Sequence, residues 1–147
     1  MIRATLFCAM ALVVVFAPSR TPAATLGFDA TLKGVSETFN GDKFPYTGTG
    51  TMTFDDVAGT VSYSFALSNG LTFSGDGTAA VTAKGRIFGV VSAGSPGIDG
   101  SAVIEGKASK DRTKFNAKIF AAIPNRLGPP PNGFVISKIK VKGTLQE

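Results

Sequence analysis

The 147-residue chain contains no histidine and no tryptophan, and the first absence limits its chemistry more than any motif does. Histidine is the usual general base near neutral pH and a frequent metal ligand. Without it, Ser-His-Asp catalysis, Cys-His catalysis and imidazole metal sites are excluded. Carboxylate pairs are considered below as one remaining catalytic chemistry.

Cysteine is almost as scarce, because Cys8 is the only one. It lies early in an apolar N-terminal run, before most of that run, so it is not placed like the modified cysteine of a lipoprotein. The remainder of the chain can form no disulfide, cysteine nucleophile or thiolate metal site. We therefore expect a fold that is stable without covalent cross-links.

The N-terminal residues have the layout of a secretory signal peptide. A positive start at Arg3 precedes the apolar run from Leu6 to Ala17, and small residues follow up to Ala24. The run is too short for a transmembrane helix. We predict a signal peptide over residues 1–23, with cleavage after Ser19 or Ala24, or a retained anchor, as alternatives. The protein is then secreted or periplasmic, and residues 24–147 form a single domain.

Helical apolar repeats are also missing, and the pattern that is present has a period of two. From Thr47 to Phe73, apolar residues such as Val61, Tyr63 and Phe65 alternate with threonine and serine. Period two places every second side chain on one face of a strand. Turn residues at Asp55–Gly59 and at Ser68-Asn69-Gly70 divide this stretch into a three-stranded antiparallel meander.

The rest of the mature chain continues in the same way. Further strands are expected over Thr25–Lys33, Thr78–Lys84, Arg86–Ser92, Ser101–Lys107, Thr113–Ile123 and Phe134–Leu145. The fold class is all-β: a single antiparallel β-sandwich or closed β-barrel of about eight or nine short strands. The last strand can pair with the first, which would remove an exposed edge.

Several segments between these strands allow more specific predictions. Gly34–Tyr46 is expected to be a long connection, with Phe39, Phe44 and Tyr46 packed over one end of the sheet or forming a binding lip. Gly75-Asp76-Gly77 is expected to be a turn.

Two other segments have an unusual composition. The apolar run Arg86–Ser92 suits a strand covered on both faces or bulged at Gly89. Pro124–Gly133, with three successive prolines, suits a stiff surface loop, or a ligand for a proline-recognising module.

Positive charge is concentrated in the second half of the chain, where residues 100–147 carry nine cationic and three acidic side chains. Alternation places Lys138, Lys140 and Lys142 on one strand face and Lys114 and Lys118 on a face of the preceding strand. No acidic residue is expected at the neighbouring outward positions. If these strands pair, the five lysines form a polyanion-binding surface, for an acidic polysaccharide, lipopolysaccharide or nucleic acid. Nucleic acid is disfavoured, because Phe120 is the one aromatic available for base stacking. Alternatively, the lysines only prevent edge-to-edge aggregation.

No metal or cofactor site is predicted. Asp55-Asp56 is the one adjacent carboxylate pair, and a hairpin turn explains it better than a calcium site, which needs several oxygen ligands at loop spacing. The glycine-rich runs lack the Lys-Ser/Thr ending of a phosphate-binding loop.

Short segments of the sequence resemble the CHRD domain, a β module of chordin and of exported bacterial proteins. They are Phe28–Gly34, Glu37, Thr47–Thr51, Gly59–Ser64, Gly70-Leu71 and the ending Lys142–Leu145. Where that family carries a histidine-containing segment, this chain has Thr72–Gly75, so no histidine-dependent property is expected. The resemblance implies an antiparallel β module without an established enzyme activity.

These observations predict an exported, non-enzymatic β-domain that acts by surface contact, with an envelope polysaccharide or another exported protein as partner. A small β-barrel that carries an apolar ligand is the alternative, since the phenylalanines could line a cavity. A carboxylate hydrolase is a third possibility and requires two acids in one cleft.

Overall fold

The computed structural model describes residues 25–95, 98–124 and 134–147, and within these it contains strands and turns but no helix. The strands are β1 (Thr25–Glu37), β2 (Lys43–Asp55), β3 (Thr60–Leu67), β4 (Thr72–Val81), β5 (Arg86–Ser95), β6 (Ile98–Ala108), β7 (Lys114–Pro124) and β8 (Phe134–Leu145). Residues 1–23 and most of the proline-rich segment, 125–133, lie outside the described residues, so the predictions made for them stay predictions.

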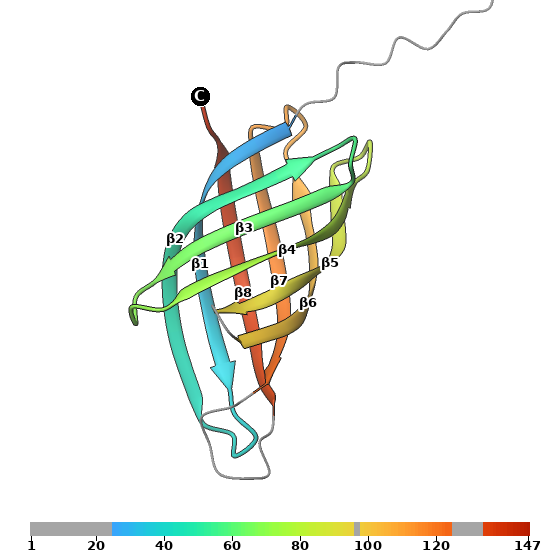
Figure 1. Ribbon diagram of the computed structural model, residues 1–147. Coiled ribbons are helices and arrows are strands. Elements are labelled where there is room, and N and C mark those ends of the chain that lie inside the picture. Colours follow the sequence, from blue (N-terminus) through green and yellow to red (C-terminus); the bar gives the residue numbers. More distant parts are fainter. Residues whose placement is uncertain (1–24, 96–97, 125–133) are drawn as a thin grey trace, which may run out of the picture.

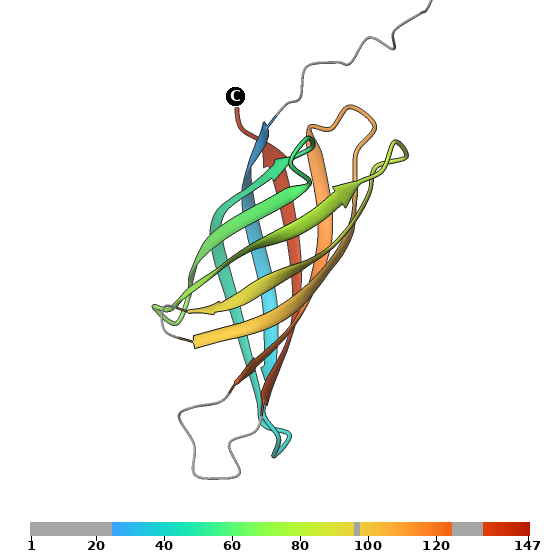
Figure 2. The same ribbon diagram turned by 45° about the vertical axis from the view of Figure 1, so that its right-hand side comes forward.

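The strands close into one antiparallel barrel of eight strands in sequence order (Figure 1 and Figure 2). β8 pairs with β1, and Leu32 lies opposite Val141 at the closing seam. The structure thereby confirms the all-β prediction and decides between its two forms in favour of the barrel. Closure pairs each of the eight described strands on both sides, so none of them presents a free edge to another chain.

Period two determines which side chains fill the barrel. Ile139 and Val141 of β8 and Phe115 and Ile119 of β7 point inward and are at most 2% exposed, whereas the lysines between them are exposed. The predicted faces of both strands are confirmed.

Aromatic side chains fill the interior in two groups. Phe28, Phe54 and Phe115 pack edge to face with ring centroids 5.0–5.9 Å apart, and Tyr63 packs on Phe65 and Phe73 at 6.0 and 5.3 Å. The space left beside the first group measures about 10 Å³, which holds about one water molecule at most. The barrel therefore has a packed core and no ligand-sized lumen among the described residues.

The predicted connection over Gly34–Tyr46 is wrong, because β1 continues to Glu37 and β2 begins at Lys43. Gly34 occupies a buried position that continues the alternation of β1. The Tyr46 ring of β2 fills the space that a side chain would take there, because a Cβ on Gly34 would lie 2.4 Å from that ring. Phe39 in the intervening turn is 83% exposed and Phe44 near the start of β2 is 56% exposed, so the predicted packing holds for Tyr46 but is wrong for these two.

Gly75-Asp76-Gly77 is not a turn but lies inside β4, which reduces the expected eight or nine strands to eight. A Cβ at Gly75 would lie 2.0 Å from the Ser92 carbonyl oxygen, and one at Gly77 would lie 2.3 Å from that of Val90. Both glycines thus permit close approach of β5, a role that a sequence pattern does not distinguish from a turn.

Both interpretations of Arg86–Ser92 are also wrong. Ile87 and Val91 point into the core, but Phe88 and Val90 are exposed on the outer surface. The register with β6 runs without interruption from Arg86 opposite Lys107 to Ser95 opposite Ile98, so there is no bulge at Gly89. The sequence of this strand is continuously apolar because both of its faces carry apolar residues, one face in the core and the other open to solvent.

The two predicted turns of the central meander are confirmed. The Asp55 carboxylate accepts hydrogen bonds from the N–H groups of Val57 and Ala58 at 2.9 and 2.8 Å, and Gly59 has φ of 64°. Asn69 accepts from the N–H of Leu71 at 3.1 Å beside Gly70 at φ 81°. Asp55 is a turn residue, as predicted.

Candidate polyanion-binding surface

All five predicted lysines lie on the outer face of the adjacent strands β7 and β8. The register places Lys118 directly opposite Lys140, Phe120 opposite Lys138 and Asn116 opposite Lys142, with Lys114 opposite Thr144. Each of the five side chains is exposed. The structure thus brings together the residues that the sequence selected.

Barrel closure extends this set across the seam. Lys140 lies opposite Lys33 of β1 as well as Lys118 of β7, so three lysines from three neighbouring strands stand side by side. We call Lys33, Lys140 and Lys118 the lysine row. Neighbouring strands are about 4.8 Å apart, and like charges directly opposite one another destabilise a sheet. The row therefore carries unfavourable repulsion that an anionic partner would relieve.

A second line of polar side chains lies two residues along from the lysine row. Lys142 of β8, Asn116 of β7, Lys107 of β6 and Arg86 of β5 lie opposite one another in succession. Sequence reasoning missed Lys33, Lys107 and Arg86, because their positions depend on the register of β1, β5 and β6. The predicted pairing of the first and last strands was the one available signal, but without the register it did not identify Lys33.

One acidic residue interrupts the lysines, contrary to expectation. Glu105 of β6 lies opposite Lys118. Within the described parts of the chain, however, no lysine or arginine nitrogen lies within 4.0 Å of a carboxylate oxygen. Glu105 lowers the local positive charge without forming an ion pair at this distance.

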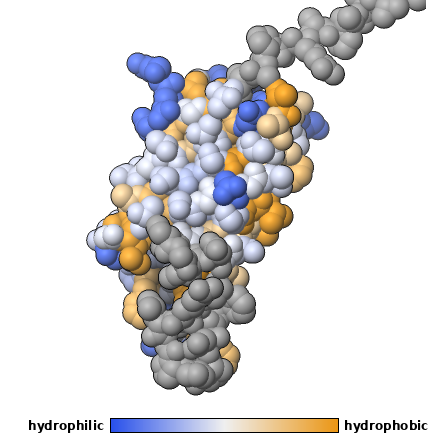
Figure 3. Space-filling view, viewed as in Figure 1, coloured by the Kyte–Doolittle hydropathy of each residue, from blue (hydrophilic) through white to orange (hydrophobic). Residues whose placement is uncertain are grey.

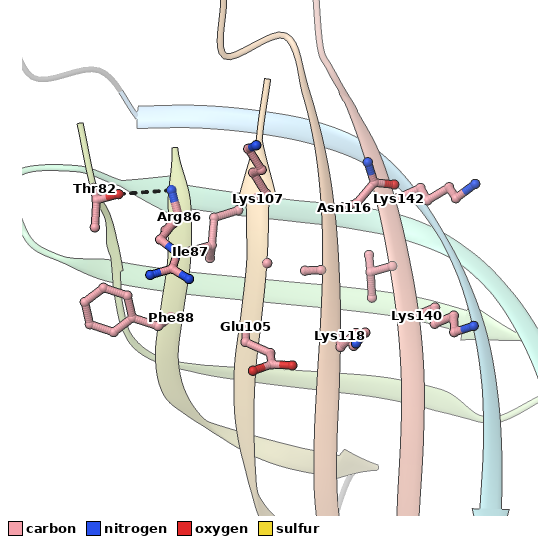
Figure 4. A pocket seen from close by; sticks show the side chains of 13 residues that line it. Thr82, Arg86, Ile87, Phe88, Glu105, Lys107, Asn116, Lys118, Lys140 and Lys142 are labelled. Atoms are coloured by element: carbon pink, nitrogen blue, oxygen red, sulfur yellow. Dashed lines mark hydrogen bonds between the residues drawn. The ribbon is translucent and has the colours of Figure 1, made fainter. Parts of the chain in front are cut away.

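An open groove of about 610 Å³ runs over the outer face of β5–β8 (Figure 4). In this view, the Glu105 carboxylate extends toward β7, whereas the ends of Lys140 and Lys142 extend past β8 toward β1. The charged and aromatic residues that line the groove are Arg86, Phe88, Glu105, Lys107, Lys118, Lys140 and Lys142. The groove is therefore cationic on two sides and has one aromatic ring at its β5 end.

Two carboxylates, Asp55 and Asp76, share a second groove of about 340 Å³ over β2–β4. Hydrogen bonds from the N–H groups of Ala58 and Val57 lower the pKa of Asp55 below 3.8, so this group stays ionised. The Ser92 hydroxyl donates to Asp76 at 3.3 Å. Carboxylate catalysis needs one acid that keeps its proton and one that is ionised, and the lowered pKa of Asp55 suits only the ionised role.

Two further possibilities concern bound groups. In residues 25–95, 98–124 and 134–147, no cluster of three or more acidic side chains is arranged to hold a metal ion. The same part of the chain contains no helix that is long and apolar enough to cross a membrane.

The sequence matches no protein-family model and no curated protein. The barrel is similar to a crystal structure of a mutant of the vaccine antigen transferrin-binding protein B from Haemophilus parasuis Hp5, with a TM-score of 0.57 and 9% sequence identity. The match covers 85% of this chain but 27% of that protein. At this identity the similarity shows a shared fold alone. None of these comparisons tests the resemblance to CHRD domains, which stays a prediction.

Proposed function

We propose that this protein is an exported, non-enzymatic β-barrel domain that works by surface contact with an anionic partner in the bacterial envelope or outside the cell. The observation that carries the proposal is the contrast between a filled interior and a cationic outer groove. Only about 10 Å³ is left beside Phe28, Phe54 and Phe115, so the interior that the described residues enclose does not favour the carrier alternative.

Export is supported by the signal-peptide pattern of residues 1–23 and by a mature sequence without cysteine. The resemblance to CHRD modules supports a role without enzyme activity. Transferrin-binding protein B, by its name, binds another protein, and its similar barrel supports a binding role for this one. An envelope polysaccharide or an acidic surface of another exported protein has the required charge.

The lysine row gives the proposal its physical basis. Lys33, Lys140 and Lys118 lie on adjacent strands with no ion pair within 4.0 Å in the described residues. A polyanion would replace their mutual repulsion by attraction and release bound counterions, so binding should weaken steeply with salt.

Heparin chromatography tests this proposal with a charge-matched control. A Lys138/Lys140/Lys142→Gln variant should elute at clearly lower salt than wild type. A Lys43/Lys84/Lys110→Gln variant removes the same charge from exposed positions elsewhere on the barrel and should elute much closer to wild type. Equal elution of the first variant and wild type would end the binding proposal.

A further inference from the structure

A band of exposed apolar side chains runs beside the lysine row on the same outer face. Val35, Lys138, Phe120, Val103 and Val90 lie opposite one another in succession across β1, β8, β7, β6 and β5. The four apolar members are 39%, 41%, 51% and 61% exposed, in that order along the band. Their side chains contribute to no part of the core, so the barrel does not need them to be apolar.

One more residue widens this line. Ile136 of β8 is two positions from Lys138, on the side away from Lys140, and is 45% exposed. Phe88 of β5 is also exposed, but it lies opposite Glu105 and so is level with the lysine row. We call Val35, Val90, Val103, Phe120 and Ile136 the apolar band. It crosses five strands, or about 19 Å at a strand spacing of about 4.8 Å. Contiguous apolar surface of this kind marks an interaction site more often than isolated exposed residues do.

The apolar band and the lysine row are separated by a constant step. Val35 and Lys33, Lys138 and Lys140, and Phe120 and Lys118 are each two residues apart on the same strand. Two residues correspond to about 6.6 Å. The outer face is thus amphipathic, with an apolar stripe parallel to a cationic stripe. Lys138 lies within the apolar stripe, where its methylene chain can lie along apolar surface while its ammonium group extends outward.

More apolar surface lies on the side of the apolar band away from the lysines. Along β1 the order is Lys33, Val35 and then the β1–β2 turn, where Phe39 is exposed, and Phe44 is exposed near the start of β2. On the opposite side, Lys142, Lys107 and Arg86 continue the positive charge beyond the lysine row. Polarity therefore changes in one direction along the strands, from apolar near the β1–β2 turn to cationic farther up the barrel.

We propose that this amphipathic face binds the surface of a membrane that contains anionic phospholipid, with the lysine row at the phosphates and the apolar band at the boundary between headgroups and acyl chains. This inference rests on the proposed function and names its partner. Interfacial proteins combine an apolar face buried about 5–10 Å with basic residues beside it, and the step of about 6.6 Å between the two stripes matches that depth.

Charge and polarity favour this partner over two others. A second copy of the chain, packed face to face about a two-fold axis, would bring the lysine rows of both copies into one interface with Glu105 as their single acidic neighbour in the groove. A soluble polysaccharide would pair with the lysines but leave the apolar band in water. A lipid surface satisfies both stripes together.

Vesicle flotation with the purified protein tests the inference. The protein should bind vesicles of phosphatidylcholine mixed with phosphatidylglycerol and bind pure phosphatidylcholine at least about tenfold more weakly. A Val90/Val103/Phe120→Thr variant should lose about tenfold or more of its vesicle binding but keep wild-type heparin retention, and a cooperative urea transition should show that it is folded. A Val57→Thr/Leu71→Ser variant, altered at exposed apolar positions in distant turns, should bind vesicles like wild type.

The outcomes separate the two proposals. Heparin retention without vesicle binding, or vesicle binding unchanged in the Val90/Val103/Phe120→Thr variant, would overturn the membrane inference and leave the proposed function standing. A concentration-dependent dimer that this variant abolishes, without vesicle binding, would assign the band to a second copy instead. If the wild-type protein bound neither heparin nor vesicles, both proposals would be overturned.

Discussion

Strands β2–β4 and strands β5–β8 belong to the same barrel and have similar apolar side chains inside it, but their outward side chains differ in polarity and charge. The outward positions of β2–β4 are largely hydroxyl residues, and the face they form in Figure 3 is mostly of intermediate hydropathy, with apolar patches toward its edges. They include Thr47, Thr49, Thr51, Ser62, Ser64 and Thr78. The outward positions of β5–β8 instead carry the apolar band and most of the exposed lysines.

This difference shows which features the fold requires. Both halves need apolar residues at alternate positions for the core, and threonine and serine outside are sufficient for strand formation. Exposed phenylalanines add no stability to such a barrel, and lysines that lie opposite one another lower its stability. The outer face of β5–β8 and β1 therefore carries the functional argument, while that of β2–β4 is a neutral reference.

The largest expected effect compares an inward and an outward phenylalanine. Phe65→Ala, at a position that is 0% exposed in β3, should lower the free energy of unfolding by roughly 3–5 kcal/mol. Phe120→Ala, at a position that is 41% exposed in β7, should lower it by less than about 1 kcal/mol. Urea denaturation measures both. An unchanged midpoint for Phe65→Ala would mean that the inward face of β3 has been assigned wrongly.

The second prediction concerns a hydrogen bond that links the two halves through the core. The Tyr63 hydroxyl of β3 donates to the Ser92 carbonyl oxygen of β5 at 2.8 Å, passing over Gly75 of β4. Burial raises the pKa of Tyr63, so the hydroxyl remains a neutral donor at any ordinary pH. Tyr63→Phe should lower the free energy of unfolding by about 1 kcal/mol, and a loss above about 3 kcal/mol would show that repacking, rather than this bond, dominates.

A smaller effect is expected from the repulsion within the lysine row. Lys140 faces Lys33 and Lys118, whereas Lys142 faces Thr31 and Asn116. Lys140→Gln should therefore stabilise the protein by about 0.2–1 kcal/mol, with a gain that shrinks as salt screens the charges. Lys142→Gln, the matched control, should change stability less. Equal effects of both variants at low salt would show that cross-strand repulsion is not felt.

The smallest effect concerns the pH dependence of stability. Each half of the barrel has a turn carboxylate with a lowered pKa, Asp55 in one and Asp111 in the other. The Ser109 hydroxyl and then the Thr113 N–H donate to Asp111 at the β6–β7 turn and lower its pKa from 3.8 to about 2. A carboxyl pKa that is lower in the folded state stabilises the fold above pH 3.8, and this contribution is lost as pH falls toward 2. Asp111→Asn should flatten the decline of thermal stability over that window but leave the part due to Asp55, whose pKa is also lowered. A decline as steep as that of wild type would refute this assignment.

Much of the fold could be predicted from the sequence, because period two and turn chemistry are local. The inward faces of β3, β7 and β8 and the turns at Asp55 and Asn69 follow from residues within a few positions of one another. The errors in the continuity of strands arose at glycines. Gly34, Gly75 and Gly89 resemble breaks or bulges in a sequence, yet each lies inside a strand where a neighbouring strand or ring approaches closely.

The candidate surface divides in the same way. Alternation alone places Lys138, Lys140 and Lys142 on one face and Lys114 and Lys118 on another, since side-chain direction along a strand depends only on parity. The sequence thus determined an all-β chain, the inward faces of its terminal strands and the five lysines. Only the tertiary structure decided that the sheet closes and that Lys33 joins the row. It also decided that Glu105 faces Lys118 and that Val35, Phe120, Val103 and Val90 form one band, because strand register depends on pairing between residues far apart in the chain.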